Sequence, residues 1–504
     1  MILTSHQIFS DVECKNNLAN KAVNSGIITI IEQVIRLLLQ VVSTSVLARH
    51  ITPDSYGLVS MVAVVTNFVT IFKDVGLSII TIQKEKITES EASNLFWINV
   101  ALSVALGIIV VLISPAVSWF YERSELTLIT IFMGVSLTIS GLSIQHQALL
   151  KRHLRFDSIL VINLASYFVS VVVMVIMAVC GYEYITLVVG TLVQNILMVL
   201  ITFYYCRWMP KKYDKSTKIN SMVKFGVNVT TFEFVNYFTR NLDNILIGKF
   251  WGSAALGLYS KAYQIVYLPI NNIRNPINSV AMPVMSRAAS DAERFRKYFK
   301  MQTVILSIIV IPLMTGMFVN AHDIILLLFG PDWINMEFVF KVLALVATFQ
   351  PVFGARGAAF MSLGRSDLYL KTGLLGSFCV IVSFIIGVNF GIEGVAIAYA
   401  CSSVATQFVT FPFLFRNSSV KLADLMEGML PTTLSAFCAA LVSIMLSKNI
   451  VIENLFFSIV FGFVVLYVVF LALMLIIPKG REQLMYLLSL LLEWFKSFRR
   501  RKNG

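Results

Sequence analysis

The chain has 504 residues, of which 57% are hydrophobic and only 13% are charged. A soluble globular protein is typically about one quarter charged, so this composition excludes a chain that faces water on all sides. The apolar residues form runs of about 20, the length that a helix needs to cross the hydrocarbon core of a bilayer. These runs do not alternate with polar residues, which excludes a transmembrane β-barrel. The sequence therefore predicts an all-α integral membrane protein.

The net charge of +13 does not indicate nucleic-acid binding, because membrane proteins concentrate Lys and Arg in their cytoplasmic loops. We therefore expect no nucleic acid among the partners. The six cysteines are scattered and lack the paired spacing of metal or redox sites. The polar stretch 1–21 has no apolar core of a signal peptide. It is predicted to be a cytoplasmic N-terminal tail.

Taken in chain order, hydropathy predicts fourteen transmembrane helices. The first six form one group, the next six form a second group, and two more follow. The predicted spans are 22–46, 56–72, 94–113, 126–149, 159–180, 184–206, 223–248, 254–285, 301–319, 338–363, 372–388, 391–415, 429–446 and 455–477.

These spans predict a domain organisation with six parts. After the tail come an N-terminal six-helix lobe at 22–207 and a basic cytoplasmic linker at 208–222. A C-terminal six-helix lobe follows at 223–416, and 417–480 holds transmembrane helices 13 and 14. The last segment, 481–504, is predicted to be an amphipathic basic cytoplasmic tail.

Charge asymmetry predicts the orientation of the chain. With both termini in the cytoplasm, most of the 40 Lys and Arg residues fall in cytoplasmic segments, as the positive-inside rule requires. The opposite side holds just four: Arg49, Arg123, Lys249 and Lys448.

The sequence also repeats itself. A shift of 200 residues aligns Arg49 with Lys249 and Gly57-Leu58 with Gly257-Leu258. The shift spans six helices, an even number, so both lobes have the same orientation in the membrane. Two pseudo-symmetric six-helix bundles with a substrate site at their interface are a transporter architecture.

Enzyme motifs are absent from the sequence. There is no GxxxxGK[ST] loop, no HExxH and no GxSxG. The five His residues are not clustered. We therefore expect no catalytic residue, no metal site and no cofactor.

Charged and polar residues recur inside the spans at three- and four-residue spacing, which places them on one face of each helix. A charge at the bilayer centre costs about 2.5–3.5 kcal/mol even on the lenient insertion scale, so these faces are predicted to line a shared, water-filled cavity. The predicted cavity cations are Arg36, Arg240, Lys261, Arg274 and Arg356. The predicted polar residues of the cavity are Gln40, Asn236, Gln264, Tyr267 and Asn271, and the predicted ion-coupling acids are Glu32, Glu233 and Asp243.

The alternative is that these charges are internal salt bridges. Glu32–Arg36 is a suitable i,i+4 pair, and Arg240 with Asp243 or Asn244 is another. Against this, the cations in the same spans outnumber the acids. The excess predicts an anionic group on the substrate, such as a diphosphate, which Arg binds well through its planar fork of donors.

Several segments resemble signature stretches of bacterial polysaccharide exporters, and they occur in the same order along the chain. They are LARHITPDSYG at 47–57, Asp74-Val75-Gly76-Leu77-Ser78 with Gln83, Phe96-Trp97 with Asn99, Arg152 with Arg155-Phe156, IGKFWG and LGLYSKA within 243–262, Phe329-Gly330 with Trp333, and Gly364-Arg365. The chain resembles the polysaccharide-transport flippases, Wzx-type or colanic-acid-exporter-like, of the multidrug/oligosaccharidyl-lipid/polysaccharide exporter superfamily. Arg49, Gly57, Gly257 and Tyr259 match signature segments and are interpreted as structural hinges and loop closures.

The resemblance implies a V-shaped pair of six-helix bundles with two further C-terminal helices in a bacterial inner membrane. It implies a cargo of undecaprenyl-diphosphate-linked repeat units, moved from the inner to the outer leaflet for O-antigen, capsule or exopolysaccharide biosynthesis. Pathway membrane proteins such as a polymerase are implied as partners. Alternating access with H⁺ or Na⁺ as the coupling ion is the expected mechanism.

Three alternatives stay open. A cation-coupled multidrug antiporter of the same superfamily would share the fold, but an acid-rich cavity is expected there. A peptidoglycan lipid-precursor flippase would share the chemistry of the cargo, although the signature segments favour the polysaccharide branch. A polymerase or ligase of the same pathway would be an enzyme, and it would usually carry a large outer loop, which this sequence lacks.

Overall fold

The structure, a computed structural model, describes residues 3–4, 9, 18–74, 76–84, 86–214, 220–450 and 452–502. Side chains are described throughout these ranges except at 3–4, 18–24, 220–236, 417, 490–491 and 493–502. Two of the predicted site residues, Glu233 and Asn236, lie outside the described side chains.

The chain divides into two compact units, Met1–Gly257 (unit 1) and Leu258–Gly504 (unit 2). The elements of unit 1 are β1 (Leu3–Thr4), α2 (Leu18–Ala48), α3 (Pro53–Asp74), α4 (Leu77–Gln83), α5 (Glu89–Leu112), α6 (Ser114–Tyr121), α7 (Glu125–Arg152), α8 (Phe156–Val179), α9 (Glu183–Tyr205) and β2 (Cys206–Arg207). The long element α10 (Asn220–Arg287) begins in unit 1 and ends in unit 2.

The elements of unit 2 after α10 are almost entirely helical. They are α11 (Ala292–Val319), α12 (Ala321–Leu328), η1 (Pro331–Met336), α13 (Glu337–Ser362), α14 (Ser366–Gly387), η2 (Val388–Phe390), α15 (Gly391–Asn417), α16 (Leu422–Asn449), α17 (Leu455–Ile476) and α18 (Pro478–Lys502).

Eleven segments of the described chain are long and apolar enough to cross a membrane. One of them, Ser366–Arg416, contains two helices, α14 and α15. The 68-residue α10 covers two more predicted spans, and its backbone is non-helical at Gly252. The all-α membrane fold is therefore confirmed. The count of fourteen helices and the lobe boundaries at 22–207 and 223–416 stay predictions.

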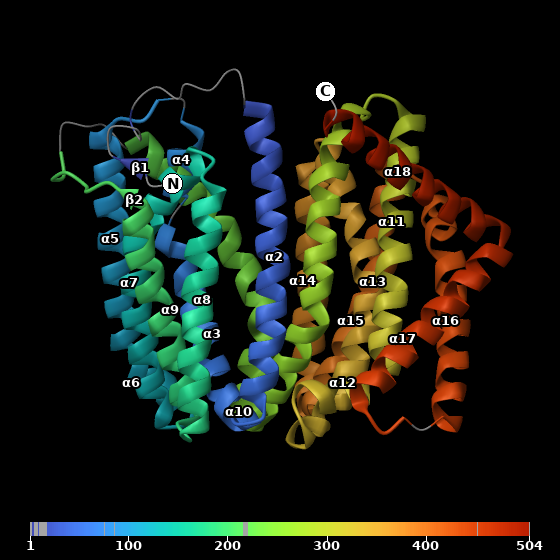
Figure 1. Cartoon of the computed structure of the whole chain (residues 1–504), viewed down its shortest axis with the longest axis horizontal. Coiled ribbons are helices and arrows are strands. Elements are labelled where there is room, and N and C mark those ends of the chain that lie inside the picture. Colours follow the sequence, from blue (N-terminus) through green and yellow to red (C-terminus); the bar gives the residue numbers. More distant parts are fainter. Residues whose placement is uncertain are drawn as a thin grey trace. The chain divides into compact units, whose positions relative to one another are not determined.

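Unit 1 is a helical bundle with different short elements at its two ends. Strand β1 pairs in parallel with β2, so the start of the chain lies beside the end of α9. Figure 1 shows these strands and α4 at one end of the bundle and α6 at the other. The start of α2 and the end of α9 thus lie on the same face, as an even number of crossings requires.

The first part of the predicted linker, 208–214, is bound to the end of unit 1 that carries β1 and β2. Trp208 is 1% exposed, and its carbonyl lies 3.0 Å from Nε2 of His146. Trp97 Nε1 donates to the carbonyl of Lys211 at 2.8 Å. Asn94 holds the backbone of Asp214 at both its carbonyl (2.7 Å) and its amide (2.8 Å). The Phe96-Trp97 signature therefore belongs to a docking site for the linker.

Replacing Asn94 by alanine is expected to release residues 208–214 from the bundle. The variant loses two hydrogen bonds, worth about 1–3 kcal/mol together. Trypsin cleavage after Lys211 and Lys212 should therefore be faster than in the wild type. Ser118→Ala, which removes a hydrogen bond near α6, is the matched control; equal cleavage of both variants would contradict the docking.

The Asp74–Gly76 signature lies between the apolar helix α3 and the short helix α4 that follows it. Gly76 has φ +70°, a conformation that glycine adopts without strain, and Asp74 accepts a hydrogen bond from the amide of Ser78 at 2.9 Å. At the other end of α4, Arg152 donates to the carbonyls of Thr81 and Lys84. The aspartate thus begins α4 and the arginine of α7 closes it.

In unit 2, α18 packs on the ends of α16 and α17. Leu484 and Leu487 contact the core cluster of these helices, and Gln483 donates to the carbonyl of Glu427 at 2.6 Å. Further along the helix, Leu488 and Leu492 are exposed. Figure 1 shows α18 running obliquely to the other helices of the unit, an arrangement typical of a helix at a membrane surface.

Candidate functional site

The polar face of α2 packs against α8. Oε1 of Glu32 accepts a hydrogen bond from Nδ2 of Asn163 at 2.6 Å, and the hydroxyls of Ser43 and Tyr167 lie 3.0 Å apart. Glu32 is 9% exposed. The predicted coupling acid therefore has a neutral amide as its partner on a second helix of unit 1.

Arg36 is the twelfth residue of the 24-residue apolar segment Ser25–Ala48, so it lies halfway through the span. Its side chain is exposed in unit 1, and Gln40, one turn further on, is half-buried. The alternative Glu32–Arg36 pair is absent from the described ion pairs, because Glu32 faces Asn163 instead.

The predicted site residues of α10 in unit 1 differ sharply in exposure. Arg240 is exposed, whereas Asp243 is 4% exposed and accepts a hydrogen bond from the amide of Asn244 at 2.8 Å. No ion pair joins Arg240 to Asp243 among the described residues. The second alternative pairing is therefore also not formed.

In unit 2, the predicted residues of α10 belong to an aromatic and amide network. Nζ of Lys261 donates to Gln264 at 3.1 Å. The rings of Tyr263 and Tyr267 are stacked with centroids 4.2 Å apart. The Tyr267 hydroxyl lies 3.3 Å from that of Tyr399 on α15.

The network continues onto α13. Tyr399 accepts a hydrogen bond from Nε2 of Gln350 at 3.0 Å. One and a half turns along α13, Nη1 of Arg356 donates to Oε1 of Gln407 at 3.2 Å, and the guanidinium lies 5.5 Å from the ring centre of Phe411. On α10, Arg274 donates to Asn271 at 3.3 Å. Tyr399, Gln350 and Gln407 were not predicted from the sequence.

The predicted cavity cations differ from the cations near the ends of the helices. Several of the latter form ion pairs with carboxylates, among them Lys249–Glu122, Arg296–Asp424, Lys300–Glu427 and Lys341–Glu337. By contrast, Arg36, Arg240, Arg274 and Arg356 form no ion pair with any residue that the structure describes. Where their hydrogen bonds are described, the partners are neutral amides.

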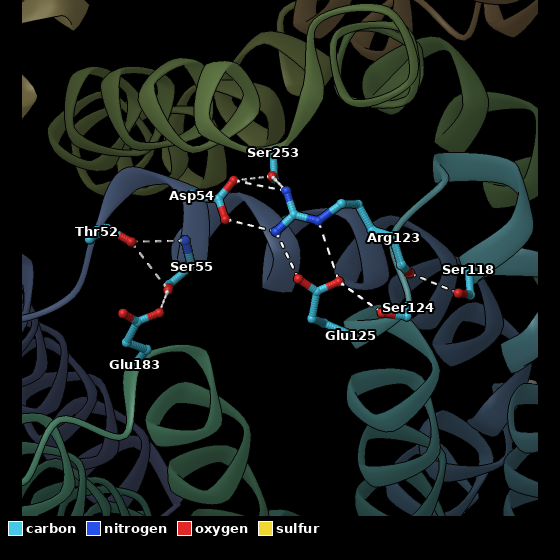
Figure 2. A network of polar contacts seen from close by, with 9 residues as sticks. All are labelled: Thr52, Asp54, Ser55, Ser118, Arg123, Ser124, Glu125, Glu183 and Ser253. Carbon is cyan, nitrogen blue, oxygen red and sulfur yellow. Dashed lines mark hydrogen bonds and ion pairs between the residues drawn. The ribbon is translucent and has the colours of Figure 1, made fainter.

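A second polar cluster of unit 1 lies at the end of the bundle that carries α6, which is predicted to face outward. We call Asp54, Arg123, Glu125 and Ser253 the Arg123 cluster. Figure 2 shows the Arg123 guanidinium between the two carboxylates, with Ser253 above it. It binds Asp54 with two hydrogen bonds, at 2.9 and 3.2 Å, Ser253 at 2.9 Å and Glu125 at 3.0 Å.

Local sequence explains why these groups converge. Thr52 caps α3 by accepting a hydrogen bond from the amide of Ser55 at 3.3 Å, and Asp54 lies in the first turn, where the helix dipole favours an acid. Gly252 has φ +81°, so α10 turns just before Ser253. The hydrogen bonds from Arg123 to Asp54 and then to Glu125 raise the pKa of the guanidinium, which therefore stays charged.

Two glycines bring α3 and α10 into backbone contact beside this cluster. A Cβ on Gly57 would overlap the backbone of Ser253, and a Cβ on Gly257 would overlap the backbone of Pro53. The two contacts are equivalent, because the shift of 200 residues that relates the repeats converts Pro53 to position 253 and Gly57 to position 257. Glycine is required at both positions for the helices to approach so closely.

Comparison with known proteins assigns the chain to a family. A family model described as "Polysaccharide biosynthesis protein" matches residues 46–338, which is more than half of the chain. The chain belongs to the polysaccharide biosynthesis protein family. The match covers the Arg123 cluster, both close-packed glycines and the aromatic stack on α10.

Two curated relatives of the family cover most of the chain. The teichuronic acid biosynthesis protein TuaB of Bacillus subtilis is 27% identical over 346 residues, which are 67% of this chain and 71% of that protein. The lipopolysaccharide biosynthesis protein WzxC of Escherichia coli is 23% identical over 398 residues, 78% of this chain and 81% of that protein. The resemblance to Wzx-type polysaccharide exporters is thereby confirmed.

Solved structures share the fold. The lipid II flippase MurJ in an inward closed conformation has a TM-score of 0.69 at 14% identity, covering 90% of this chain and 98% of that chain. An inward-facing multidrug transporter of the MATE family has a TM-score of 0.60 at 14% identity, covering 76% and 94%. The polysaccharide biosynthesis family member described here is therefore a multi-pass membrane protein with a transporter fold.

Proposed function

We propose that the protein is a flippase for lipid-linked oligosaccharides. Its cargo is an undecaprenyl-diphosphate-linked repeat unit, moved from the inner to the outer leaflet of a bacterial inner membrane for polysaccharide biosynthesis. Both termini lie in the cytoplasm in this proposal. The protein itself catalyses no covalent reaction, and a polymerase of the same pathway is an expected partner.

One observation carries the proposal. Arg36, Arg240 and Arg356 lie within apolar segments or helices and form no ion pair with a described carboxylate, whereas several cations near the helix ends do. An unpaired charge in the membrane is costly, so such residues are retained where they face water or bind an anion. A diphosphate fits this requirement, because Arg pairs with phosphate oxygens through two parallel hydrogen bonds.

The proposed mechanism is alternating access. The saccharide and the diphosphate enter a polar cavity from the cytoplasmic side while most of the polyprenyl tail stays in the lipid. Release on the other side requires the predicted outer end to open, and the contacts of the Arg123 cluster must then break. A gradient of H⁺ or Na⁺ drives the cycle, with Glu32, Glu233 and Asp243 as candidates for the group that responds to the ion.

The MATE-like fold makes a multidrug antiporter the second candidate, and the MurJ-like fold makes a peptidoglycan lipid-precursor flippase the third. Neither neighbour exceeds 14% identity to this chain, so each likeness concerns the fold alone. An antiporter for cationic drugs requires acids in its cavity, whereas the predicted cavity cations here are not neutralised. The family match favours the polysaccharide cargo.

The test is the leaflet in which the lipid-linked saccharide resides. In cells that lack the protein, inside-out vesicles should expose the saccharide to a membrane-impermeant glycosidase, and right-side-out vesicles should not. Expression of the wild type should reverse this distribution. If the saccharide reaches the outer leaflet without the protein while drug sensitivity rises, the antiporter replaces the proposal. If the peptidoglycan precursor accumulates instead, the third candidate replaces it.

A further inference from the structure

A cavity of about 330 Å³ lies in unit 2 between α13, α14 and α15. Its walls are mostly apolar and include Phe349 and Phe353 of α13, Val380 of α14 and Val404 of α15. Val404 is 53% exposed, so the cavity is open at the surface of the unit. A cavity of this size accepts a stretch of one apolar chain rather than the two chains of a phospholipid.

One end of this cavity is polar and lies next to a cation. Gln407 lines the cavity and accepts the hydrogen bond from Arg356. Arg356 is half-buried and stands behind Gln407 rather than in the lining itself; its guanidinium has five N–H donors, more than the bond to Gln407 uses. Among the described residues that line the cavity there is no Asp or Glu. This end therefore fits an anionic oxygen-rich group.

The polar end of the cavity is nearer the predicted cytoplasmic surface than the apolar end, as the headgroup and the chain of a cytoplasmic-leaflet lipid are. Arg356 lies six residues before the end of α13 at Ser362, about 9 Å along the helix axis, and this end is predicted to be cytoplasmic. Phe349 and Leu345 lie about two and three turns deeper in the span. A lipid phosphate at Arg356 would thus direct its chain from the cytoplasmic surface towards the bilayer centre.

We propose that this cavity binds the first isoprenoid units of a polyprenyl diphosphate, with a phosphate at the rim beside Gln407, where the neighbouring guanidinium of Arg356 supplies the positive charge. The assignment rests on the proposed function and names a subsite for its cargo. Gln350 and Tyr399, which are hydrogen-bonded to each other across the cavity, fix the distance between α13 and α15 at its deeper end. A single Arg and an amide contact one phosphate, which leaves the second phosphate and the saccharide outside the cavity.

The test uses the purified full-length protein in nanodiscs and farnesyl diphosphate as the probe. Arg356→Gln is expected to weaken binding about ten- to hundredfold, the effect of losing hydrogen bonds to a charged group. Ala400→Phe fills the cavity from α15 and should weaken binding by about tenfold or more. Lys371→Gln removes an exposed cation of α14 outside the cavity and should bind as the wild type does.

Two further probes separate the contributions of phosphate and chain. Farnesol, which lacks the phosphates, should respond to Ala400→Phe but not to Arg356→Gln. Thermal unfolding shows whether each variant is folded, and Val404→Phe replaces Ala400→Phe if the latter does not fold. Wild-type affinity in both Arg356→Gln and the cavity-filling variant would overturn the assignment. Displacement of the probe by phosphatidylglycerol at equal affinity would also overturn it, because the cavity would then be a general lipid site.

The leaflet assay keeps this inference distinct from the proposed function. If the saccharide crosses the membrane without the protein, the proposed function fails whatever the binding data show. If crossing depends on the protein but Ala400→Phe supports it fully and binds the probe normally, only the cavity assignment fails.

Discussion

Replacing Arg36 by alanine is expected to slow movement of the lipid-linked saccharide strongly without unfolding the protein. Arg36 lies halfway through an apolar segment and forms no ion pair with a described residue, so its removal leaves no carboxylate unpaired. Each charge-assisted hydrogen bond to the diphosphate is worth about 1.5–3 kcal/mol, which predicts a loss of about ten- to hundredfold in transport rate at low cargo concentration. The leaflet assay measures this loss directly.

Two variants control for this substitution. Arg36→Lys keeps the charge but loses the planar fork, so it should retain part of the activity. Lys371→Ala removes an exposed cation of α14 and should transport normally. Full activity of Arg36→Ala, together with a higher unfolding temperature, would show that Arg36 is only an uncompensated charge and would remove it from the cargo site.

The spans were predictable because hydropathy acts over whole helices. The prediction 126–149 corresponds to α7 (Glu125–Arg152), and 338–363 corresponds to α13 (Glu337–Ser362). The short helices were missed, since α4, α6 and α12 have seven or eight residues, too few to cross a bilayer. A local signal for α4 was nevertheless present, because Asp74 and Gly76 mark a helix break.

Partners of the site residues were not predictable, because sequence spacing identifies only neighbours on the same helix. The alternative interpretation paired Glu32 with Arg36, four residues away, but the partner of Glu32 is Asn163, 131 residues away. Arg123 was counted only as a charge of the outer side, while its partners Asp54 and Ser253 are 69 and 130 residues away. Such contacts depend on how the helices pack.

The repeat is the one case in which sequence comparison aligned two segments that the structure brings into contact, although no contact between them was predicted. The shift of 200 residues aligned Gly57 with Gly257 before any packing was known. In the structure Gly57 lies against the backbone of Ser253, four residues before Gly257. Gly257 in turn lies against the backbone of Pro53, four residues before Gly57. Two copies of one segment that contact each other symmetrically form an isologous contact. The glycines are steric requirements of that crossing, and their interpretation as hinges and loop closures stays a prediction.

A disulfide between positions 54 and 253 is expected to stop transport reversibly. The carboxylate of Asp54 and the hydroxyl of Ser253 are in direct hydrogen-bond contact, and the helices that carry them touch at Gly57 and Gly257. Thiols in Asp54→Cys/Ser253→Cys, made without the six native cysteines, should therefore oxidise readily. Alternating access requires the predicted outer end to open, so the oxidised protein should retain the saccharide on the cytoplasmic leaflet, and a reductant should restore transport.

The matched control is a cysteine pair with both positions inside the predicted N-terminal lobe. If this lobe moves as a rigid body, the distance between the two positions does not change during transport. Ser136 and Asn195 are hydrogen-bonded at 2.7 Å between α7 and α9, so oxidation of Ser136→Cys/Asn195→Cys should leave transport unchanged. Each single cysteine variant tests whether loss of Asp54 or Ser253 alone impairs the protein. Normal transport by a fully oxidised 54–253 pair would mean that α3 and α10 remain in contact throughout the cycle. The Arg123 cluster would then hold a permanent joint, and the cargo would have to leave by a route that does not separate them.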